Sequence, residues 1–487
     1  MKITIKHGSK TLINEYDNPI KIIDALQENN ILISSPCGGN GKCGKCKVII
    51  ENNKTKKEVF ACKTILTEDA IIYVNLLEGS GLLEMNLNSH FSKNLEEGFG
   101  IALDIGTTTL AFYLVDLNTA NIIDKYSTLN PQKIYGADVV SRINACINGK
   151  LKELTKVIHN EIKNVLNYFI KKHSLSSIKK LIVTGNTTML HLFIGEDVSS
   201  LGKAPFTPKF LNKIEKSGTE MNLDVEKVVL MPSFSSFVGA DLVSGCLSTN
   251  ILNENAILID IGTNGEILLN YNNKLYSTST AAGPAFEGND IECGIGGVSG
   301  AISHAKMENK HFICETIDNA SPIGICGSGL FDIVNIMIEE NIIDETGAFS
   351  IENDKLYLTD NIYISQKDIR KFQLAKSAIR SGLDVLIKTA KAKYNDIEKV
   401  YIAGGLGFYI SKSSAINLGL IPKQLENKIE VIGNSAGSGA IISLISDEAI
   451  KFADEIAKSA TNVDLTNNSL FFEYFVDNMS FKNEQEE

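Results

Sequence analysis

One short sequence occurs twice in this chain, and it constrains the fold more than any single element does. Asp-Ile-Gly-Thr-Thr-Thr at residues 104–109 returns as Asp-Ile-Gly-Thr-Asn-Gly at residues 260–265. Each copy follows an apolar run and precedes another strand-like run. A repeat of this kind predicts two related halves that face each other across a cleft.

The apolar runs beside these copies are typical of strands that are buried on both faces. They lie at residues 101–104, 181–184, 256–260 and 400–403. Parallel sheets are covered by helices on both faces, so their strands are continuously apolar rather than alternating. Each run leads into a Gly, Thr or Asn loop and then into a helical pattern. We therefore expect an α/β fold whose chemistry lies in those loops.

The first 75 residues are shorter and more mixed in pattern. We expect a hairpin from residues 2–7 and 10–13, a helix over 19–29 and strands at 47–51 and 71–74. Residues 76–98 show little periodicity and are expected to form a connector.

These patterns predict five segments along the 487 residues, since a chain of this length exceeds what one hydrophobic core holds. The segments are an N-terminal unit at 1–78, a linker at 79–98, one half of the α/β domain at 99–250, the other half at 251–457 and a tail at 458–487. We expect the apolar part of the tail to dock and its charged end to fray.

Four of the nine cysteines crowd into the first 62 residues. They are Cys37, Cys43, Cys46 and Cys62, in the pattern Cys-x5-Cys-x2-Cys followed by a distant fourth. A [2Fe–2S] cluster needs four thiolates, and three on one tight loop with a fourth from a strand satisfy that need. Glycines inside the loop let the backbone curl around the sulfides. Zinc stays as the alternative, although a zinc ribbon normally pairs two Cys-x2-Cys steps.

The rest of the composition excludes several classes of function. The net charge of −11 is spread along the chain, without a basic and aromatic cluster that could bind nucleic acid. No run approaches the roughly 20 apolar residues that span a bilayer. The start alternates like a strand, so we expect no signal peptide and a cytoplasmic protein.

The remaining cysteines are expected to be small buried hydrophobes: Cys146, Cys246, Cys293, Cys314 and Cys326.

An apolar strand that ends in Asp-x-Gly-Thr-Thr resembles the first phosphate loop of a large superfamily. That superfamily contains actin, acetate and sugar kinases and the large heat-shock chaperones, and its fold is a duplicated actin-like (RNase H-like) ATPase domain. There the aspartate holds hydrated Mg²⁺, and Gly and Thr donate to phosphate oxygens. The resemblance implies these roles for Asp104, Gly106, Thr107 and Thr108.

Two further stretches resemble the remaining nucleotide loops of the superfamily. The second copy of the repeat is similar to the second phosphate loop, which clamps the β- and γ-phosphates. It supplies Asp260, Gly262, Thr263 and Asn264. Tyr-Ile-Ala-Gly-Gly-Leu-Gly at residues 401–407 resembles the adenosine loop, where Gly404 and Gly405 would approach the ribose and purine.

Residues 239–242 and 437–440 resemble the two connecting helices that cross at the hinge of the superfamily. Asp241 and Glu266 are the candidates for the group that positions the attacking water. Glycine-rich pieces at 185–189, 283–288 and 324–329 are expected either to line the cleft or to form tight turns. His191 is expected to be structural.

Taken together, the motifs resemble the reductive activators of corrinoid proteins over nearly the whole chain. The decisive ones are the cysteine pattern, Asp-Ile-Gly-Thr-Asn-Gly-Glu, Ala-Gly-Pro-Ala-Phe-Glu-Gly and Gly-Ile-Cys-Gly-Ser-Gly-Leu. The resemblance implies a β-grasp ferredoxin followed by the ATPase. Its cofactors would be a [2Fe–2S] cluster, ATP and Mg²⁺.

The family's activity is the ATP-dependent transfer of one electron to cobalt(II), which gives cobalt(I). The implied partners are a corrinoid protein or a cobalamin-dependent methyltransferase and a low-potential electron donor, while a homodimer stays open. Two alternatives remain. One is an activator of radical dehydratases or reductases, and the other is a redox sensor that gates a binding surface by nucleotide. Electron transfer to an added corrinoid protein separates the sensor from the reductase.

Overall fold

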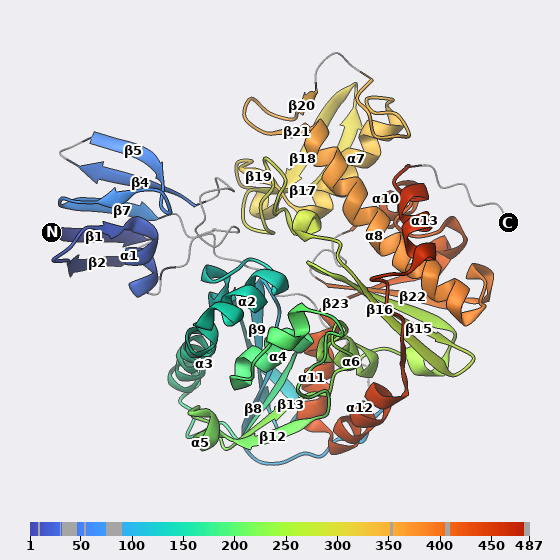
Figure 1. Ribbon diagram of the computed structural model, residues 1–487, viewed down its shortest axis with the longest axis horizontal. Coiled ribbons are helices and arrows are strands. Elements are labelled where there is room, and N and C mark those ends of the chain that lie inside the picture. The colour runs from blue at the N-terminus through green and yellow to red at the C-terminus, as the bar shows by residue number, and fades with distance from the viewer. Residues whose placement is uncertain are drawn as a thin grey trace.

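The fold is described here from a computed structural model, which covers residues 1–7, 10–29, 31, 46–52, 55–74, 90–350, 354–404 and 410–481. Figure 1 shows a small N-terminal sheet drawn in blue beside two larger lobes. Each larger lobe is built on a six-stranded sheet. Among the described residues, no helix combines the length and apolar character needed to cross a bilayer.

The N-terminal unit is a five-stranded mixed sheet with one helix. Its strands, in sheet order, are β2 (Lys10–Glu15), β1 (Lys2–His7), β7 (Ala70–Val74), β4 (Lys47–Asn52) and β5 (Thr55–Phe60). The first and last strands of the unit, β1 and β7, run parallel at its centre, which is the β-grasp arrangement. Alternation buries Ile3 and Ile5 on the face that the helix covers. That helix, α1 (Ile22–Glu28), begins later than expected because β3 (Ile20–Lys21) pairs with β6 (Ile65–Leu66).

The first lobe carries the first copy of the repeat. Its sheet order is β10 (Asn121–Leu129), β9 (Thr109–Asp116), β8 (Phe99–Ile105), β11 (Lys180–Gly185), β13 (Lys227–Leu230) and β12 (Ile214–Ser217). The lobe's helices are α2 (Val139–Ala145), α3 (Leu151–His173), α4 (Thr187–Ile194), α5 (Gly218–Met221) and α6 (Ala240–Leu247). The expected strands 101–104 and 181–184 are the centres of β8 and β11, which are parallel and fully buried there apart from Asp104.

The second lobe repeats this plan. Its sheet order is β23 (Ile429–Gly433), β22 (Lys399–Ala403), β14 (Ala256–Ile261), β15 (Gly265–Tyr271), β16 (Lys274–Thr280) and β24 (Thr461–Asn462). Its helices are α7 (Gly327–Glu339), α8 (Gln366–Ala390), α10 (Lys412–Asn417) and α13 (Ser469–Asp477). Small sheets extend it: β17 (Ala301–Glu308), β18 (His311–Thr316) and β19 (Gly324–Ile325), with β20 (Lys355–Tyr357) and β21 (Tyr363–Ser365).

The two copies of the repeat have the same local structure. Each forms the turn of an antiparallel hairpin, β8–β9 in the first lobe and β14–β15 in the second. In each lobe the strand before the turn also pairs in parallel with a later strand, β11 or β22. The two related halves predicted from the repeat are therefore confirmed, as is the duplicated actin-like fold that the resemblance implies.

The chain returns to the first lobe after β23. Helix α11 (Ser435–Ile445) packs against α6 and against β8 and β11, and α12 (Asp447–Ser459) follows it. Glycines allow the close crossing of α6 and α11, since a Cβ on Gly439 would lie 1.8 Å from the carbonyl oxygen of Ser244. The expected connecting helices are thus found at α6 and α11, and they join the lobes. The five segment limits predicted from the sequence stay predictions.

The apolar part of the tail docks as expected, but not with every apolar residue. The Gln373 side chain of α8 donates to the carbonyl oxygen of Met479 at 2.7 Å, and Phe481 is 4% exposed. By contrast, Phe472 and Val476 on α13 are 56% and 70% exposed. The end of the tail, residues 482–487, lies outside the described residues.

The expectation that all five scattered cysteines are buried is wrong for two of them. Cys146, Cys246 and Cys326 are buried, whereas Cys293 and Cys314 are only partly buried. Cys314 lies on β18, an edge strand whose side chains alternate between exposed and partly covered positions. A strand with one open face leaves such residues in contact with water.

Candidate functional site

Four carboxylates predicted from the sequence lie at equivalent strand ends and at the start of a connecting helix. Asp104 lies near the end of β8 and Asp260 near the end of β14. Glu266 is the direct cross-strand partner of Asp260, and Asp241 lies in the first turn of α6. The mutual charge effects among these groups place them in one acidic cluster.

The electrostatics of this acidic cluster favour a bound cation. Burial and the charge of Asp241 raise the pKa of Asp104 to about 7, although a hydrogen bond from Asn434 lowers it. Burial, followed by the charges of Asp241, Asp104 and Glu287, raises the pKa of Asp260 to about 8. Burial also raises the pKa of Asp241 and, with neighbouring charges, that of Glu266. A divalent cation reverses such shifts because it stabilises the ionised carboxylates.

The geometry fits a hydrated ion better than a cage of protein ligands. Within the described ranges, no three Asp, Glu, His or Cys side chains converge closely enough to hold one ion. The Oε2 atom of Glu266 is buried and lacks a hydrogen-bond partner. Mg²⁺ keeps several waters and takes only one or two carboxylates alongside phosphates. The acidic cluster therefore fits Mg²⁺ that is held through water.

The first loop is held in place from behind by three side chains. Asn130 donates to the carbonyl oxygen of Gly106 at 2.8 Å, and Asn186 donates to Oγ1 of Thr107 at 3.0 Å. Arg142, which is fully buried, donates to the carbonyl oxygen of Thr107. Burial lowers the pKa of Arg142 to about 9. A buried positive charge thus lies beneath the loop predicted to bind phosphate.

The second loop is joined to the first by a residue that sequence reasoning did not single out. Thr108 and Thr263 both donate to the carboxylate of Glu287, at 3.0 and 2.9 Å. Within the second loop, the Gly262 amide donates to the carbonyl oxygen of Asn264 at 3.0 Å. The signal for Glu287 was its position as the one acidic residue in the glycine-rich piece 283–288.

The predicted adenosine loop is described only at its start. Gly404 follows β22 with φ of +91°, and a Cβ there would lie 2.5 Å from the carbonyl oxygen of Ile261. Gly404 therefore allows close approach to the second copy of the repeat. Gly405 and the remainder of this motif lie outside the described residues.

Two of the four predicted cluster cysteines are described, and they are adjacent. Cys46 immediately precedes β4 and Cys62 lies in the turn after β5, with their sulfur atoms 3.2 Å apart. Both thiols are buried. Two cysteine sulfurs brought together in this way fit the ligands of one iron in a two-iron cluster. Cys37 and Cys43 lie outside the described residues.

The glycine-rich piece 324–329 and His191 both make structural contacts. Ser328, in the piece 324–329, donates to the carbonyl oxygen of Ser303 at 2.8 Å. The Nδ1 atom of His191 is 2.7 Å from the carbonyl oxygen of Thr187, and its Nε2 accepts from the Lys209 amide at 3.0 Å. Burial lowers the pKa of His191. A neutral structural histidine, as expected, satisfies both contacts.

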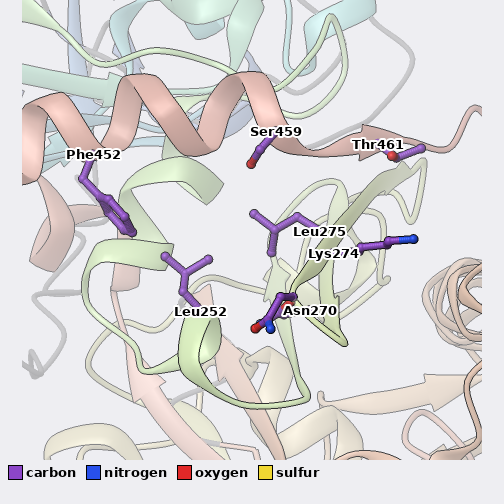
Figure 2. Close-up of a pocket in the computed structure, with 8 residues that line it drawn as sticks. Leu252, Asn270, Lys274, Leu275, Phe452, Ser459 and Thr461 are labelled. Carbon is purple, nitrogen blue, oxygen red and sulfur yellow. The ribbon is translucent and has the colours of Figure 1, made fainter.

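A separate hollow lies away from these loops. It measures about 310 Å³ and lies between α12, the hairpin β15–β16 and the 3₁₀ turn Ile251–Asn253. Figure 2 shows Phe452, Leu252 and Leu275 around it, with Lys274 at one side. None of the predicted site residues lines this hollow.

Comparison with known proteins decides the family. The model of the C-terminal domain of RACo, the ASKHA domain, matches residues 254–487, and that of the RACo middle region matches residues 99–254. The model of the 2Fe-2S iron-sulfur cluster binding domain matches residues 6–69. Corrinoid activation enzyme RamQ of Eubacterium limosum is 30% identical over 568 residues, which cover 94% of this chain and 96% of RamQ. The chain belongs to the corrinoid activation enzymes.

Two further similarities support this family of corrinoid activation enzymes. A protein of Methanosarcina barkeri named [Co(II) methylated amine-specific corrinoid protein] reductase is 26% identical over 399 residues, 74% of this chain and 73% of its own. The solved structure of a reductive activator for corrinoid, iron-sulfur protein has 27% identity and a TM-score of 0.73, with 98% of both chains covered. In this chain the match to the 2Fe-2S domain precedes the match to the ASKHA domain.

Proposed function

We propose that this chain reduces the cobalt(II) of a corrinoid protein to cobalt(I) by one electron, with hydrolysis of Mg-ATP assisting the transfer. The observation that carries the proposal is the presence on one chain of a buried cysteine pair and of two copies of the repeat joined through Glu287. Cys46 and Cys62 lie 3.2 Å apart in the N-terminal unit. Thr108 and Thr263 share one carboxylate in the ATPase lobes. The names of the two relatives, a corrinoid activation enzyme and a corrinoid protein reductase, agree with this activity.

The ATPase roles follow from the positions of the side chains. Asp104 and Asp260 would hold hydrated Mg²⁺ between the lobes, because their raised pKa values fall when a cation binds. The backbone and hydroxyl donors of both loops would bind phosphate oxygens, and Gly404 and Gly405 would face the adenosine. Asp241 and Glu266 remain the candidates that position the attacking water. The phosphate donors proposed are Gly106, Thr107, Thr108, Gly262, Thr263 and Asn264.

The N-terminal unit would supply the electron. Cys37, Cys43, Cys46 and Cys62 would hold a [2Fe–2S] cluster, which provides one electron at about −400 mV in plant-type ferredoxins. Each 100 mV by which cobalt reduction is more demanding costs about 2.3 kcal/mol for one electron. Closure of the two lobes around ATP would offset that deficit by changing the grip on the corrinoid protein.

The partners follow the same reasoning. We propose a corrinoid protein or a cobalamin-dependent methyltransferase as the electron acceptor, and a low-potential donor that reduces the chain in the cytoplasm. The spread of the −11 net charge supports a protein acceptor rather than a nucleic acid.

Reduction of an added corrinoid protein tests the proposal. The chain is reconstituted anaerobically with iron and sulfide, reduced, and mixed with cobalt(II) corrinoid protein and Mg-ATP while the visible spectrum is recorded. We expect cobalt(I) to form with the reconstituted chain and not with Cys62→Ser. A chain that binds zinc instead of iron, or that leaves the corrinoid spectrum unchanged, contradicts the proposal.

A further inference from the structure

Glu287 bridges the two loops that carry the copies of the repeat. Oγ1 of Thr108 donates to Oε2 of Glu287 at 3.0 Å, and Oγ1 of Thr263 donates to Oε1 at 2.9 Å. Thr108 belongs to the first lobe and Thr263 to the second. One carboxylate therefore occupies the hydroxyl donors of both lobes at once.

The backbone holds this carboxylate firmly. Glu287 ends the 3₁₀ turn Pro284–Glu287, which is flanked by Gly283 and Gly288 with φ of +78° and +74°. Phe286, next to it, is 1% exposed and packs on Phe331 with ring centroids 4.8 Å apart. A Cβ on Gly288 would lie 2.0 Å from the carbonyl oxygen of Ile295. The turn is thus anchored in the core of the second lobe, with Glu287 directed at both loops.

A hydroxyl group cannot serve two acceptors at once. Each threonine carries one O–H hydrogen, so a hydroxyl that donates to Glu287 has none left for a phosphate oxygen. The carboxylate also carries the same sign of charge as phosphate, and it already acts on Asp260, whose pKa it helps to raise. Both effects oppose a phosphate that approaches the two threonines.

We propose that Glu287 competes with the terminal phosphate of the nucleotide for the hydroxyl hydrogens of Thr108 and Thr263, and so limits the affinity for nucleotide. The inference rests on the proposed function, because it needs a nucleotide at these loops. When the phosphate takes the two hydroxyls, Glu287 releases the first lobe. The turn Pro284–Glu287 then remains attached to the second lobe alone.

The competition also links nucleotide binding to α8. Five residues beyond Glu287, the amide of Glu292 donates to Asp368 in the first turn of α8 at 2.9 Å. The Glu292 carboxylate accepts from Tyr363 at 2.8 Å. Release of Glu287 is therefore transmitted along a short segment that is fixed to the helix.

The affinity for a nonhydrolysable ATP analogue tests the inference on the full chain. Isothermal titration calorimetry with Mg-AMPPNP compares the unaltered chain with Glu287→Gln, which removes the charge and can itself donate to phosphate. We expect Glu287→Gln to bind at least about fivefold more tightly. Glu308→Gln is the matched control, since it makes the same change at an exposed residue of β17 in the same lobe, outside the loops, and its affinity should not change.

Two further variants keep the result decisive. In a Thr108→Val/Thr263→Val background, Glu287→Gln should give a smaller gain, because the contested hydroxyls are absent and only the charge repulsion is removed. An undiminished gain in that background overturns the competition for the hydroxyls. Glu287→Asp, which is one methylene shorter, should also bind more tightly and replaces Glu287→Gln if that variant does not fold. Equal or weaker binding by the Glu287 variant overturns the inference while nucleotide binding itself persists. Failure of every variant and of the unaltered chain to bind the analogue overturns the proposed function instead.

Discussion

Asn434 donates from its Nδ2 atom to the carboxylate of Asp104 at 3.0 Å, although the two residues are 330 positions apart. The same amide donates to the hydroxyl of Tyr113 at 3.1 Å. Its Oδ1 accepts from the Gly437 amide at 2.7 Å and so caps α11. One side chain therefore couples the start of α11 to β8.

Replacement of Asn434 separates these two roles. Asn434→Ala should destabilise the chain by about 1 kcal/mol through loss of the helix cap. Asn434→Ser keeps a capping oxygen but is too short to reach Asp104. It should therefore be more stable than Asn434→Ala, while both variants should lose ATP hydrolysis. Thermal unfolding and steady-state ATPase assays on the two variants check this. Normal hydrolysis by Asn434→Ser would show that the contact with Asp104 is not needed.

Binding of Mg-nucleotide should release protons near neutral pH. The pKa values of Asp104 and Asp260 are raised to about 7 and about 8, so both are partly protonated at pH 7.5. Mg²⁺ lowers these values, and we expect release of about one proton per nucleotide. The number of protons released is measured by titrating the preformed Mg-AMPPNP complex into the protein in buffers of different ionisation enthalpy. Release should vanish near pH 9.5, and a binding enthalpy independent of buffer at pH 7.5 would contradict the acidic cluster.

The same carboxylates make stability depend on pH when Mg²⁺ is removed. The pKa of Asp260 is about 8 in the folded state and is lower in the unfolded state. At pH values between these two pKa values, the folded state binds more protons than the unfolded state. Stability in EDTA should therefore fall as pH rises from 5 to 9. Asp260→Asn carries no charge at this position, so it should lose less stability as the pH rises. At pH 8 it should unfold at a temperature about 3 °C higher than the unaltered chain. Its ATPase activity should nevertheless be lost, and a lower unfolding temperature than the unaltered chain would argue against buried charge.

The crossing of the connecting helices should not accept a methyl group. A Cβ on Gly439 would lie 1.8 Å from the Ser244 carbonyl oxygen, so Gly439→Ala should destabilise the chain by about 3 kcal/mol. Gly296→Ala is the control, because its Cβ would meet nothing within 4 Å. Chemical denaturation compares the two. Equal stability would mean that the helices separate at no cost.

Loss of one cysteine should abolish the cluster selectively. Cys62→Ser removes one thiol of the adjacent pair, so the reconstituted protein should hold far less than the roughly two irons per chain of a [2Fe–2S] protein. Cys314→Ser changes a partly buried cysteine of β18 and should keep its iron. Iron and sulfide analysis with visible spectra distinguishes the two. Equal iron in both variants would exclude Cys62 as a ligand.

Much of the fold follows from local pattern. The repeat predicted two related halves, and in both halves the apolar strand before Asp-x-Gly-Thr leads into the same turn, at Asp104 and at Asp260. The order of ferredoxin and ATPase followed from the cysteine spacing and the loops. These features depend on residues that are close together in the sequence, so local sequence patterns are enough to predict them.

The missed residues act through distant contacts. Glu287 meets Thr108 across 179 positions, and Asn434 meets Asp104 across 330. Arg142 supports the first loop as a buried charge, which no local pattern distinguishes from a solvated arginine. Cys314 was expected to be buried because the sequence does not reveal that its strand lies at a sheet edge. Contacts between side chains of different lobes produce no periodic pattern in the sequence, so they cannot be predicted from it.

The most direct test of the central claim is the rate at which cobalt(I) forms on a corrinoid protein, with and without Mg-ATP. The reduced, cluster-loaded chain is mixed with cobalt(II) corrinoid protein and followed by absorbance, beside Asp260→Asn, which we expect to be unable to use ATP. We predict at least about tenfold faster formation with ATP, equivalent to about 1.4 kcal/mol, and no acceleration in Asp260→Asn. The same rate with and without ATP would contradict the account.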